Sequence, residues 1–271
     1  MERKKLSVHT VVDWVLRCGD IDNRYAEESS MQLGAAAHRK LQRQMGDTYQ
    51  KEVPLQVETT AGGVPILLQG RADGILLEDG ETVIDEIKTT VLPMEKLRQQ
   101  QQQHLGQAKC YAYMYLKQLE QSPPQITIQL TYYQLETEEL QRQRLTFTCE
   151  EIDRFFADLM GRYAVWMSYE QRWKTLRDLS IRETSFPYSA YRPGQRELAV
   201  AVYRTIQREK KLYVQAPTGI GKTMSTLFPA VKAMGEQQLD KLFYLTAKTV
   251  TRTVAEEAIG LLHDKGLRLK Y

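Results

Sequence analysis

A short stretch of the chain combines acidic and basic residues with the pattern of a β-hairpin. Residues 70–90 read G-R-A-D-G-I-L-L-E-D-G-E-T-V-I-D-E-I-K-T-T, and an Asp-Gly pair at 79–80 separates two β-prone runs. Such a pair between apolar runs is a strong signal for a tight hairpin. The hairpin predicts that Asp73 lies directly opposite Glu86. Facing side chains lie about 5 Å apart, so two carboxylates there repel each other unless a cation offsets their charge.

Lys88 adds a third charged side chain to this group. The same register pairs Glu78 with Glu81, and Lys88 follows Glu86 by two residues, which predicts that both point to the same face. Mg²⁺ is usually held by one or two carboxylates together with water and substrate phosphate. A nearby lysine can stabilise the charge of the attacked phosphate or help to position the attacking water. The pattern indicates metal-dependent phosphodiester cleavage. The alternative is a surface hairpin with scattered acids, because an E-x-K tripeptide alone is common.

These residues resemble the core of the PD-(D/E)xK nuclease superfamily, in its RecB-like branch. The resemblance rests on Gly70, Asp73 and the E-I-K tripeptide at 86–88. It implies that Asp73 and Glu86 bind Mg²⁺ or Mn²⁺, and that Lys88 acts electrostatically or positions water. The substrate it implies is DNA, either single-stranded or at duplex ends.

Two residues ahead of the hairpin match further positions of this family. His38 falls in G-A-A-A-H-R-K-L, within a helix expected over 30–45, and RecB-like nucleases carry a histidine there that reaches the metal. Glu52 lies in a strand expected over 51–58 and matches an acid that helps to hold metal or water. Taken without the resemblance, His38 is a half-buried helix histidine and Glu52 a solvated strand glutamate.

The helix expected after the hairpin carries Gln107 and Tyr111, which are four residues apart and therefore share one face. The RecB-like branch has a Q-x-x-x-Y motif at this place, which implies that both residues assist catalysis. Their side chains can hydrogen-bond a DNA phosphate or a water molecule without adding charge. The alternative is amphipathic packing together with Tyr113 and Tyr115. The order of acids, lysine and then Q-x-x-x-Y favours the functional interpretation.

Composition places the chain among ordinary soluble proteins of about two domains. It has 271 residues, of which 42% are hydrophobic and 26% charged, and a net charge of only +3. A DNA path would therefore depend on local patches of charge. Cys18, Cys110 and Cys149 are far apart and give neither a zinc motif nor a disulfide framework. The N-terminus has no apolar signal region and no run is long enough for a membrane helix, so we expect a cytoplasmic protein without a membrane partner.

A second motif follows the compact apolar run K-L-Y-V-Q at 211–215. The sequence A-P-T-G-I-G-K-T is a P-loop pattern with alanine in place of the first glycine, and M-S-T-L-F continues it as a helix. Strand, loop and helix in this order are the context that supports ATP binding. Backbone N–H groups would bind phosphate, Lys222 would contact the β- and γ-phosphates and Thr223 would ligate Mg²⁺. The predicted nucleotide-binding residues of this loop are Ala216, Pro217, Thr218, Gly219, Ile220, Gly221, Lys222 and Thr223.

The segment around the P-loop resembles the start of XPD/DinG-type DNA helicases, within the DEAD/DEAH-like group. In that group a glutamine ahead of the P-loop recognises adenine, and Gln195 in Y-R-P-G-Q matches it. Thr246 and Thr249 match threonines that contact the DNA backbone. No acidic motif follows to hold Mg²⁺, so the chain is expected to bind ATP without hydrolysing it by itself. We therefore expect the remainder of a helicase beyond Tyr271.

The predicted architecture has two parts. Residues 1–180 are expected to form an α+β nuclease domain with a mixed sheet flanked by helices, residues 181–190 a linker, and residues 191–271 the start of an α/β RecA-like P-loop domain. The iron-sulphur members of the RecB-like branch bracket the nuclease with four cysteines, which this chain lacks, so no cluster is expected in this portion. Beyond the hairpin, strands are predicted at 126–135, 143–148, 211–215 and 241–250, and helices at 7–19, 93–119, 150–179 and 250–263.

Two other functions remain open at this point. In the first, the front domain is a nuclease relic that grips DNA without cutting it, and the protein is purely a helicase. In the second, the chain is a nucleotide-binding adaptor with no nucleic acid partner.

Overall fold

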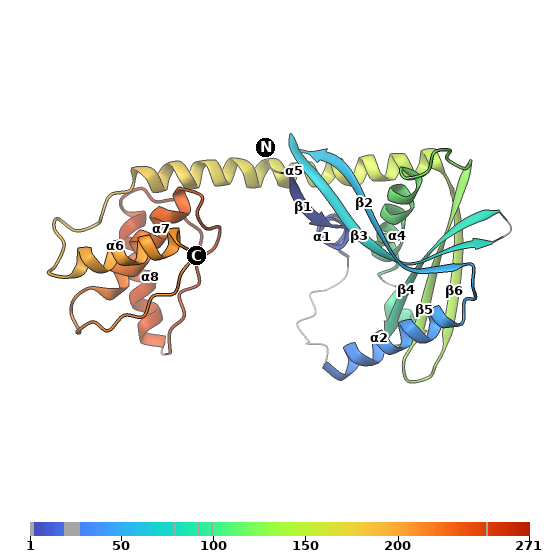
Figure 1. Ribbon diagram of the computed structural model, residues 1–271, viewed down its shortest axis with the longest axis horizontal. Helices are drawn as coiled ribbons and strands as arrows, with labels where there is room; N and C mark the ends of the chain where they lie inside the picture. Colours follow the sequence, from blue (N-terminus) through green and yellow to red (C-terminus); the bar gives the residue numbers. More distant parts are fainter. Residues whose placement is uncertain (1–2, 19–27, 79, 92, 99, 248) are drawn as a thin grey trace. The chain divides into compact units, whose positions relative to one another are not determined.

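The computed structural model describes the chain except residues 1–2, 19–27, 79, 92, 99 and 248. It divides into two compact units, Met1–Ser168 and Tyr169–Tyr271, and each is described by itself. The first unit contains β1 (Lys4–Ser7), α1 (Val8–Leu16), α2 (Glu28–Arg43), β2 (Tyr49–Ala61), β3 (Val64–Glu78), β4 (Glu81–Thr90), α3 (Met94–Arg98), α4 (Gln101–Leu116), β5 (Gln125–Gln134) and β6 (Leu140–Thr148). The long helix α5 (Cys149–Glu183) belongs to both units, and α6 (Gln195–Gln207), α7 (Lys222–Gly235) and α8 (Thr249–His263) belong to the second (Figure 1).

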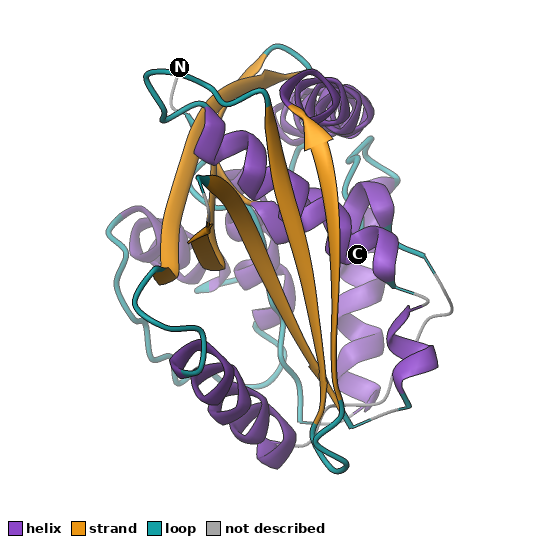
Figure 2. Ribbon diagram, turned by 90° about the vertical axis from the view of Figure 1, so that its right-hand side faces the viewer, coloured by secondary structure: helices purple, strands orange, loops and turns teal. Residues whose placement is uncertain are grey.

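The first unit is built on a six-stranded mixed sheet with the order β1-β3-β4-β5-β6, and β2 pairs with β3. The β1–β3 and β4–β5 pairs are parallel, whereas β2–β3, β3–β4 and β5–β6 are antiparallel. Figure 2 shows the strands with helices on their faces. This arrangement confirms the predicted mixed sheet flanked by helices.

The hairpin that joins β3 and β4 has the predicted register. Glu78 pairs with Glu81, and the pairing continues to Gly74 and Asp85. Gly80 has a φ of +82°, a left-handed conformation that is common in tight hairpin turns and that glycine adopts at little cost. The other turn residue, Asp79, lies outside the described residues. A local turn signal thus fixed the pairing of two strands correctly.

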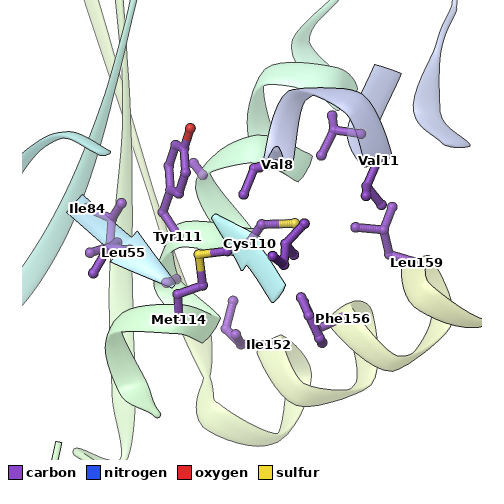
Figure 3. Close-up of a cluster of buried hydrophobic side chains, with 14 of the residues drawn as sticks. Val8, Val11, Leu55, Ile84, Cys110, Tyr111, Met114, Ile152, Phe156 and Leu159 are labelled. Atoms are coloured by element: carbon purple, nitrogen blue, oxygen red, sulfur yellow. The ribbon is translucent and has the colours of Figure 1, made fainter. Parts of the chain in front are cut away.

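The main core lies on the sheet face covered by α1, α4 and α5. Cys110, Met114, Ile152, Phe156 and Leu159 all take part in it, and Figure 3 shows their side chains packed together between α4 and α5. The hydroxyl of Tyr111 points away from this apolar cluster in the same view. Each fully buried aliphatic or aromatic side chain of this kind contributes about 1.5–3 kcal/mol to folding. The rigid core therefore holds α4 firmly behind the strands.

The opposite sheet face is covered by α2. Ile87 and Tyr133 pack there against Ala37 and Leu41 of α2. Side chains alternate along a strand, so Ile87 points away from the face occupied by Ile84 of the main core.

The described helices include none long and apolar enough to cross a membrane.

Most elements predicted for the first unit are present with small shifts at their ends. Ser7 caps α1, because its side-chain oxygen accepts from the backbone N–H of Thr10 at 3.0 Å. The strand predicted at 51–58 is longer, since β2 begins at Tyr49. The single helix predicted over 93–119 is wrong in detail: α3 and α4 are two helices, and Gln100 precedes α4 without a side-chain cap.

The prediction of strands on either side of the P-loop is wrong. The described residues at 211–215 and 241–247 form no strand, and Tyr213, Phe243 and Leu245 are 90%, 79% and 89% exposed. A strand is stable only when its backbone groups are paired, and no described segment pairs with these residues. The expected helices are nevertheless formed, because α7 and α8 bury apolar residues against Ile181 near the end of α5. The RecA-like parallel sheet is absent from the described part of the second unit.

Two glycines of the first unit allow a matched test of how Tyr49 packs against β3. A Cβ at Gly74 would overlap the ring of Tyr49, whereas a Cβ at Gly161 in α5 meets no atom within 4 Å. We expect Gly74→Ala to destabilise the protein by about 1–3 kcal/mol through overpacking. Gly161→Ala should stabilise it by up to about 1 kcal/mol through higher helix propensity. Urea unfolding measures both, and equal effects would contradict the packing of Tyr49 over Gly74.

Candidate active site

A cavity of about 1470 Å³ opens where β3 and β4 separate, between α2 and α4. It is lined by residues from the sheet and from both of these helices. All seven residues that the sequence predicted for nuclease chemistry line it: His38, Glu52, Asp73, Glu86, Lys88, Gln107 and Tyr111. Residues that are up to 73 positions apart in the sequence therefore line the same cavity.

The strands part at the position where the two acids were predicted to face each other. Backbone pairing between β3 and β4 runs from the turn to Gly74 and Asp85. At the next position, Oδ2 of Asp73 accepts the backbone N–H of Ile87 at 2.7 Å. Beyond it β4 continues alongside β5, with Glu86 next to Leu130. The Asp73 carboxylate thus takes the place of a ladder hydrogen bond and sits beside Glu86.

Glu86 is a buried acid with one close cation among the described residues. The residue is 1% exposed, and its Oε1 lies 2.6 Å from Nζ of Lys88. This contact is an ion pair without hydrogen-bond geometry, so neither carboxylate oxygen has a hydrogen-bond partner among the described residues. Burial raises the pKa of Glu86 to about 8, although Lys88 opposes the shift and Asp73 adds to it. The site holds an acid whose charged form needs more stabilisation than the protein supplies.

The charged form of Asp73 is stabilised by more neighbouring groups than the charged form of Glu86. Burial raises its pKa, and three groups oppose this shift: His38, the backbone N–H of Ile87 and Lys88. Nδ1 of His38 lies 3.7 Å from Oδ1 of Asp73. The structure therefore brings the histidine of α2 to one of the two hairpin acids.

Lys88, Gln107 and Tyr111 form a hydrogen-bonded chain that lines the same cavity as Glu86. Nζ of Lys88 donates to Oε1 of Gln107 at 3.1 Å, and Nε2 of Gln107 donates to the hydroxyl of Tyr111 at 3.2 Å. Gln107 and Tyr111 are buried, and a Cβ at Gly70 would meet the Tyr111 ring. Only glycine leaves room at position 70 for this ring, which gives the glycine of the motif a packing role.

Glu52 occupies an uncommon backbone conformation at the rim of the cavity. Its φ is +56°, a left-handed value that costs a non-glycine residue about 1 kcal/mol or more. Oε2 contacts Nε of Arg71 at 2.6 Å, and Oε1 accepts from Gln42 at 3.1 Å. The side chain of Gln42 also donates to the backbone oxygen of Asp73 at 2.9 Å. Glu52 is therefore held in place, but its carboxylate is engaged by these partners.

Several residues of this region were missed by sequence reasoning. Gln42 lies one turn after His38 on the same face of α2, a spacing that could have suggested it. His9 lines the cavity from the start of α1 and has no such signal. Asp85, next to Glu86 in the chain, is buried on the other face and accepts from Tyr49, Gln129 and Thr131. These partners lie in β2 and β5, and Asp85 does not line the cavity.

The residues of the cavity fit a hard divalent cation. Among the described residues no three His, Cys, Asp or Glu side chains form a ready-made cluster. One or two carboxylates are nevertheless enough for Mg²⁺, which keeps several waters. Glu86 offers two buried oxygens without hydrogen-bond partners, and the carboxylate of Asp73 lies beside it. Residues that would hold the ion are thus present, although its full set of ligands is not preformed.

The predicted nucleotide-binding residues come together in the second unit. Nζ of Lys222 donates to the backbone oxygens of Ala216 and Pro217 at 3.0 and 2.8 Å, so the lysine folds back over its own loop. Gln195 is buried and its amide donates to the backbone oxygen of Gly221 at 3.5 Å. Gly219 and Gly221 have φ values of +85° and +82°, which only glycine adopts freely. Thr218, Ile220 and Thr223 lie in or next to the same loop, whereas Thr246 lies in the segment before α8 and Thr249 begins that helix.

Comparison with known proteins shows the family of this chain. The model of the PD-(D/E)XK nuclease superfamily matches residues 12–209, which is more than half of the chain. The chain therefore belongs to the PD-(D/E)XK nuclease superfamily. The match includes strands β2 to β6 and all seven residues named above.

Two individual proteins are similar over parts of the chain. A segment of 46 residues is 41% identical to the "Probable ATP-dependent helicase MJ0942" of Methanocaldococcus jannaschii, and it covers 17% of this chain and 7% of that protein. This chain thus matches only a small part of that relative. The solved structure titled "Crystal structure of SSO0001" is 21% identical, with a TM-score of 0.37, over 59% of this chain and 76% of that chain.

Proposed function

We propose that the first unit cleaves phosphodiester bonds of DNA with Mg²⁺ or Mn²⁺. The observation that carries this proposal is Glu86, a buried carboxylate whose oxygens lack hydrogen-bond partners among the described residues. It lines the same cavity as Asp73 and Lys88. The ion pair with Lys88 offsets only part of the desolvation cost of this acid, because burial still raises the pKa of Glu86 to about 8. A divalent cation would supply the missing partner of these oxygens.

The residues at the centre of the cavity have distinct roles in this proposal. Asp73 and Glu86 would hold the metal, which when bound would polarise the phosphate and lower the pKa of water. The Lys88 ammonium faces the attacked phosphate and stabilises its developing negative charge. Gln107 orients this ammonium through the 3.1 Å hydrogen bond to its amide oxygen.

The remaining predicted residues assist at the edges of the cavity. His38 stands 3.7 Å from Asp73 and can add a neutral nitrogen ligand when it is unprotonated. Glu52 can add an oxygen if it exchanges its contact with Arg71 for one with the cation or its water. Tyr111 ends the hydrogen-bonded chain and can position a phosphate oxygen or water through its hydroxyl.

We further propose that the second unit binds ATP as the first part of a helicase motor. The support comes from the P-loop pattern, from Gln195 beside Gly221, and from the short match to a protein described as a probable helicase. We place the domain boundaries at 1–180, 181–190 and 191–271. In the intact helicase the motor would feed DNA past the nuclease. Titration with a fluorescent ATP analogue tests this part, and the absence of saturable binding would contradict it.

One experiment separates the nuclease from the alternatives. The chain is incubated at low salt with labelled single-stranded and duplex DNA, with Mg²⁺ or Mn²⁺, and a parallel sample contains a chelator. We expect shortened DNA that disappears on chelation. Binding without cleavage would indicate a nuclease relic that only grips DNA. No binding at low salt, where phosphate contacts are strongest, would favour a nucleotide-binding adaptor.

A further inference from the structure

His9 is a histidine of the cavity wall to which the proposed mechanism gives no role. It is the second residue of α1 and lines the cavity next to Ser7 and Val8. Nε2 of its imidazole lies 3.2 Å from Nε2 of Gln107. Since Gln107 also bonds Lys88, the histidine is one side chain away from the lysine.

The hydrogen bonds of Gln107 define which atoms donate and which accept. Its oxygen accepts from Nζ of Lys88, and its nitrogen donates to the hydroxyl of Tyr111. An amide nitrogen carries only donors, so its second N–H can bond His9 only when Nε2 of the imidazole is an unprotonated acceptor. A reversed amide would set two N–H donors against the Lys88 ammonium. The three contacts are therefore compatible with one amide orientation and one state of His9.

The surroundings of His9 favour that state. The residue as a whole is exposed, but its ring is packed closely enough for desolvation to lower its pKa below the ordinary value of 6.5. The Lys88 ammonium lowers the pKa further, whereas Asp13 and Asp73 oppose the shift. A neutral imidazole is thus the dominant form at neutral pH.

We propose that His9 is a positioning residue for the proposed cleavage reaction. As a hydrogen-bond acceptor, His9 fixes the amide of Gln107 so that the amide oxygen points toward Lys88. The Lys88 ammonium is thereby held next to Glu86, where it can face the attacked phosphate of the proposed reaction. The inference rests on the proposed nuclease function, because the orientation of Gln107 matters only if the Lys88 ammonium faces the attacked phosphate. His9 itself touches neither of the two acids through any described hydrogen bond.

Two variants of the full chain test the role of the acceptor. In His9→Gln the side-chain oxygen can reach the place of Nε2, whereas in His9→Asn the side chain is one carbon shorter and cannot. We expect His9→Asn to lower kcat for Mg²⁺-dependent DNA cleavage roughly fivefold to tenfold with little change in KM, the effect of one neutral hydrogen bond. His9→Gln should restore most of this loss. Equal activity in both variants, whether normal or reduced, would overturn the proposal.

A second measurement does not depend on cleavage. Nitrogen-15 NMR of the imidazole at neutral pH reports which ring nitrogen of His9 carries the proton. We expect Nδ1 to be protonated and Nε2 to be free, and we expect this preference to weaken in Gln107→Leu, which removes the amide donor. A proton on Nε2 in the wild-type chain would overturn the inference. If the wild-type chain cuts no DNA, the proposed function fails, yet this spectrum still decides the contact between His9 and Gln107.

Discussion

Lys88→Ala should lower metal-dependent DNA cleavage by at least about 100-fold, the usual cost of removing one group that stabilises developing charge. The lysine is the cation closest to the buried carboxylate of Glu86, at 2.6 Å. Without it the attacked phosphate loses its positive neighbour. The fold should persist, because the Glu86 carboxyl can take up a proton once its counter-charge is gone. Initial rates on labelled DNA, together with circular dichroism, measure the two effects separately.

A matched control removes an equal charge elsewhere. Lys40 of α2 pairs with the exposed Glu138 at 2.8 Å and does not line the cavity. Solvent screens such an exposed ion pair, so it contributes little to stability. Lys40→Ala should therefore cleave DNA at close to the wild-type rate. Undiminished cleavage by Lys88→Ala would show that Lys88 has no part in the chemistry.

The geometry around the acids could be predicted because it depends on local signals. An Asp-Gly turn fixes the register of β3 and β4 within a few residues, and strand alternation then decides which side chains share a face. Helix spacing likewise places Gln107 and Tyr111 together. These rules involve only neighbouring residues, and the hydrogen bond between the two side chains agrees with them.

Contacts between distant segments could not be predicted in the same way. His9 reaches Gln107 across 98 positions, and Gln42 reaches Asp73 across 31. No pattern marks His9, and the helical spacing of Gln42 from His38 does not reveal which distant group Gln42 contacts, because tertiary packing forms the cavity. The left-handed backbone of Glu52 is equally hidden, since glutamate is not a residue that favours it.

In the second unit, local signals predicted strands that the structure does not form. The runs at 211–215 and 241–250 are rich in residues of high β-propensity. Such propensity describes how well a residue fits a half-buried sheet surface, and it has no effect without a neighbouring strand. With Phe243 and Leu245 largely exposed, the described residues offer no such surface.

Glu86 should make the stability of the metal-free protein fall as the pH rises. Burial raises its pKa from the ordinary 4.5 to about 8 in the folded state. Between these two values the unfolded chain releases a proton that the folded chain retains, so rising pH favours unfolding. The stability that Glu86 contributes is complete below pH 4.5 and is lost as the pH passes 8, with a total on the order of 5 kcal/mol. Burial raises the pKa values of Asp73 and Asp85 as well, and both shifts act in the same direction.

Glu86→Gln isolates this contribution and connects it with metal binding. Thermal unfolding with a chelator present should show a much weaker fall between pH 5 and pH 8 in this variant than in the wild type. Mg²⁺ or Mn²⁺ should raise the Tm of the wild type at pH 8, because a ligand that binds only the folded state stabilises it, and it should leave Glu86→Gln unchanged. Glu81→Gln, which removes an exposed acid from the same strand, should behave like the wild type in both respects. If Glu86→Gln keeps the wild-type pH dependence and still gains stability from the metal, Glu86 is not the residue that holds the cation.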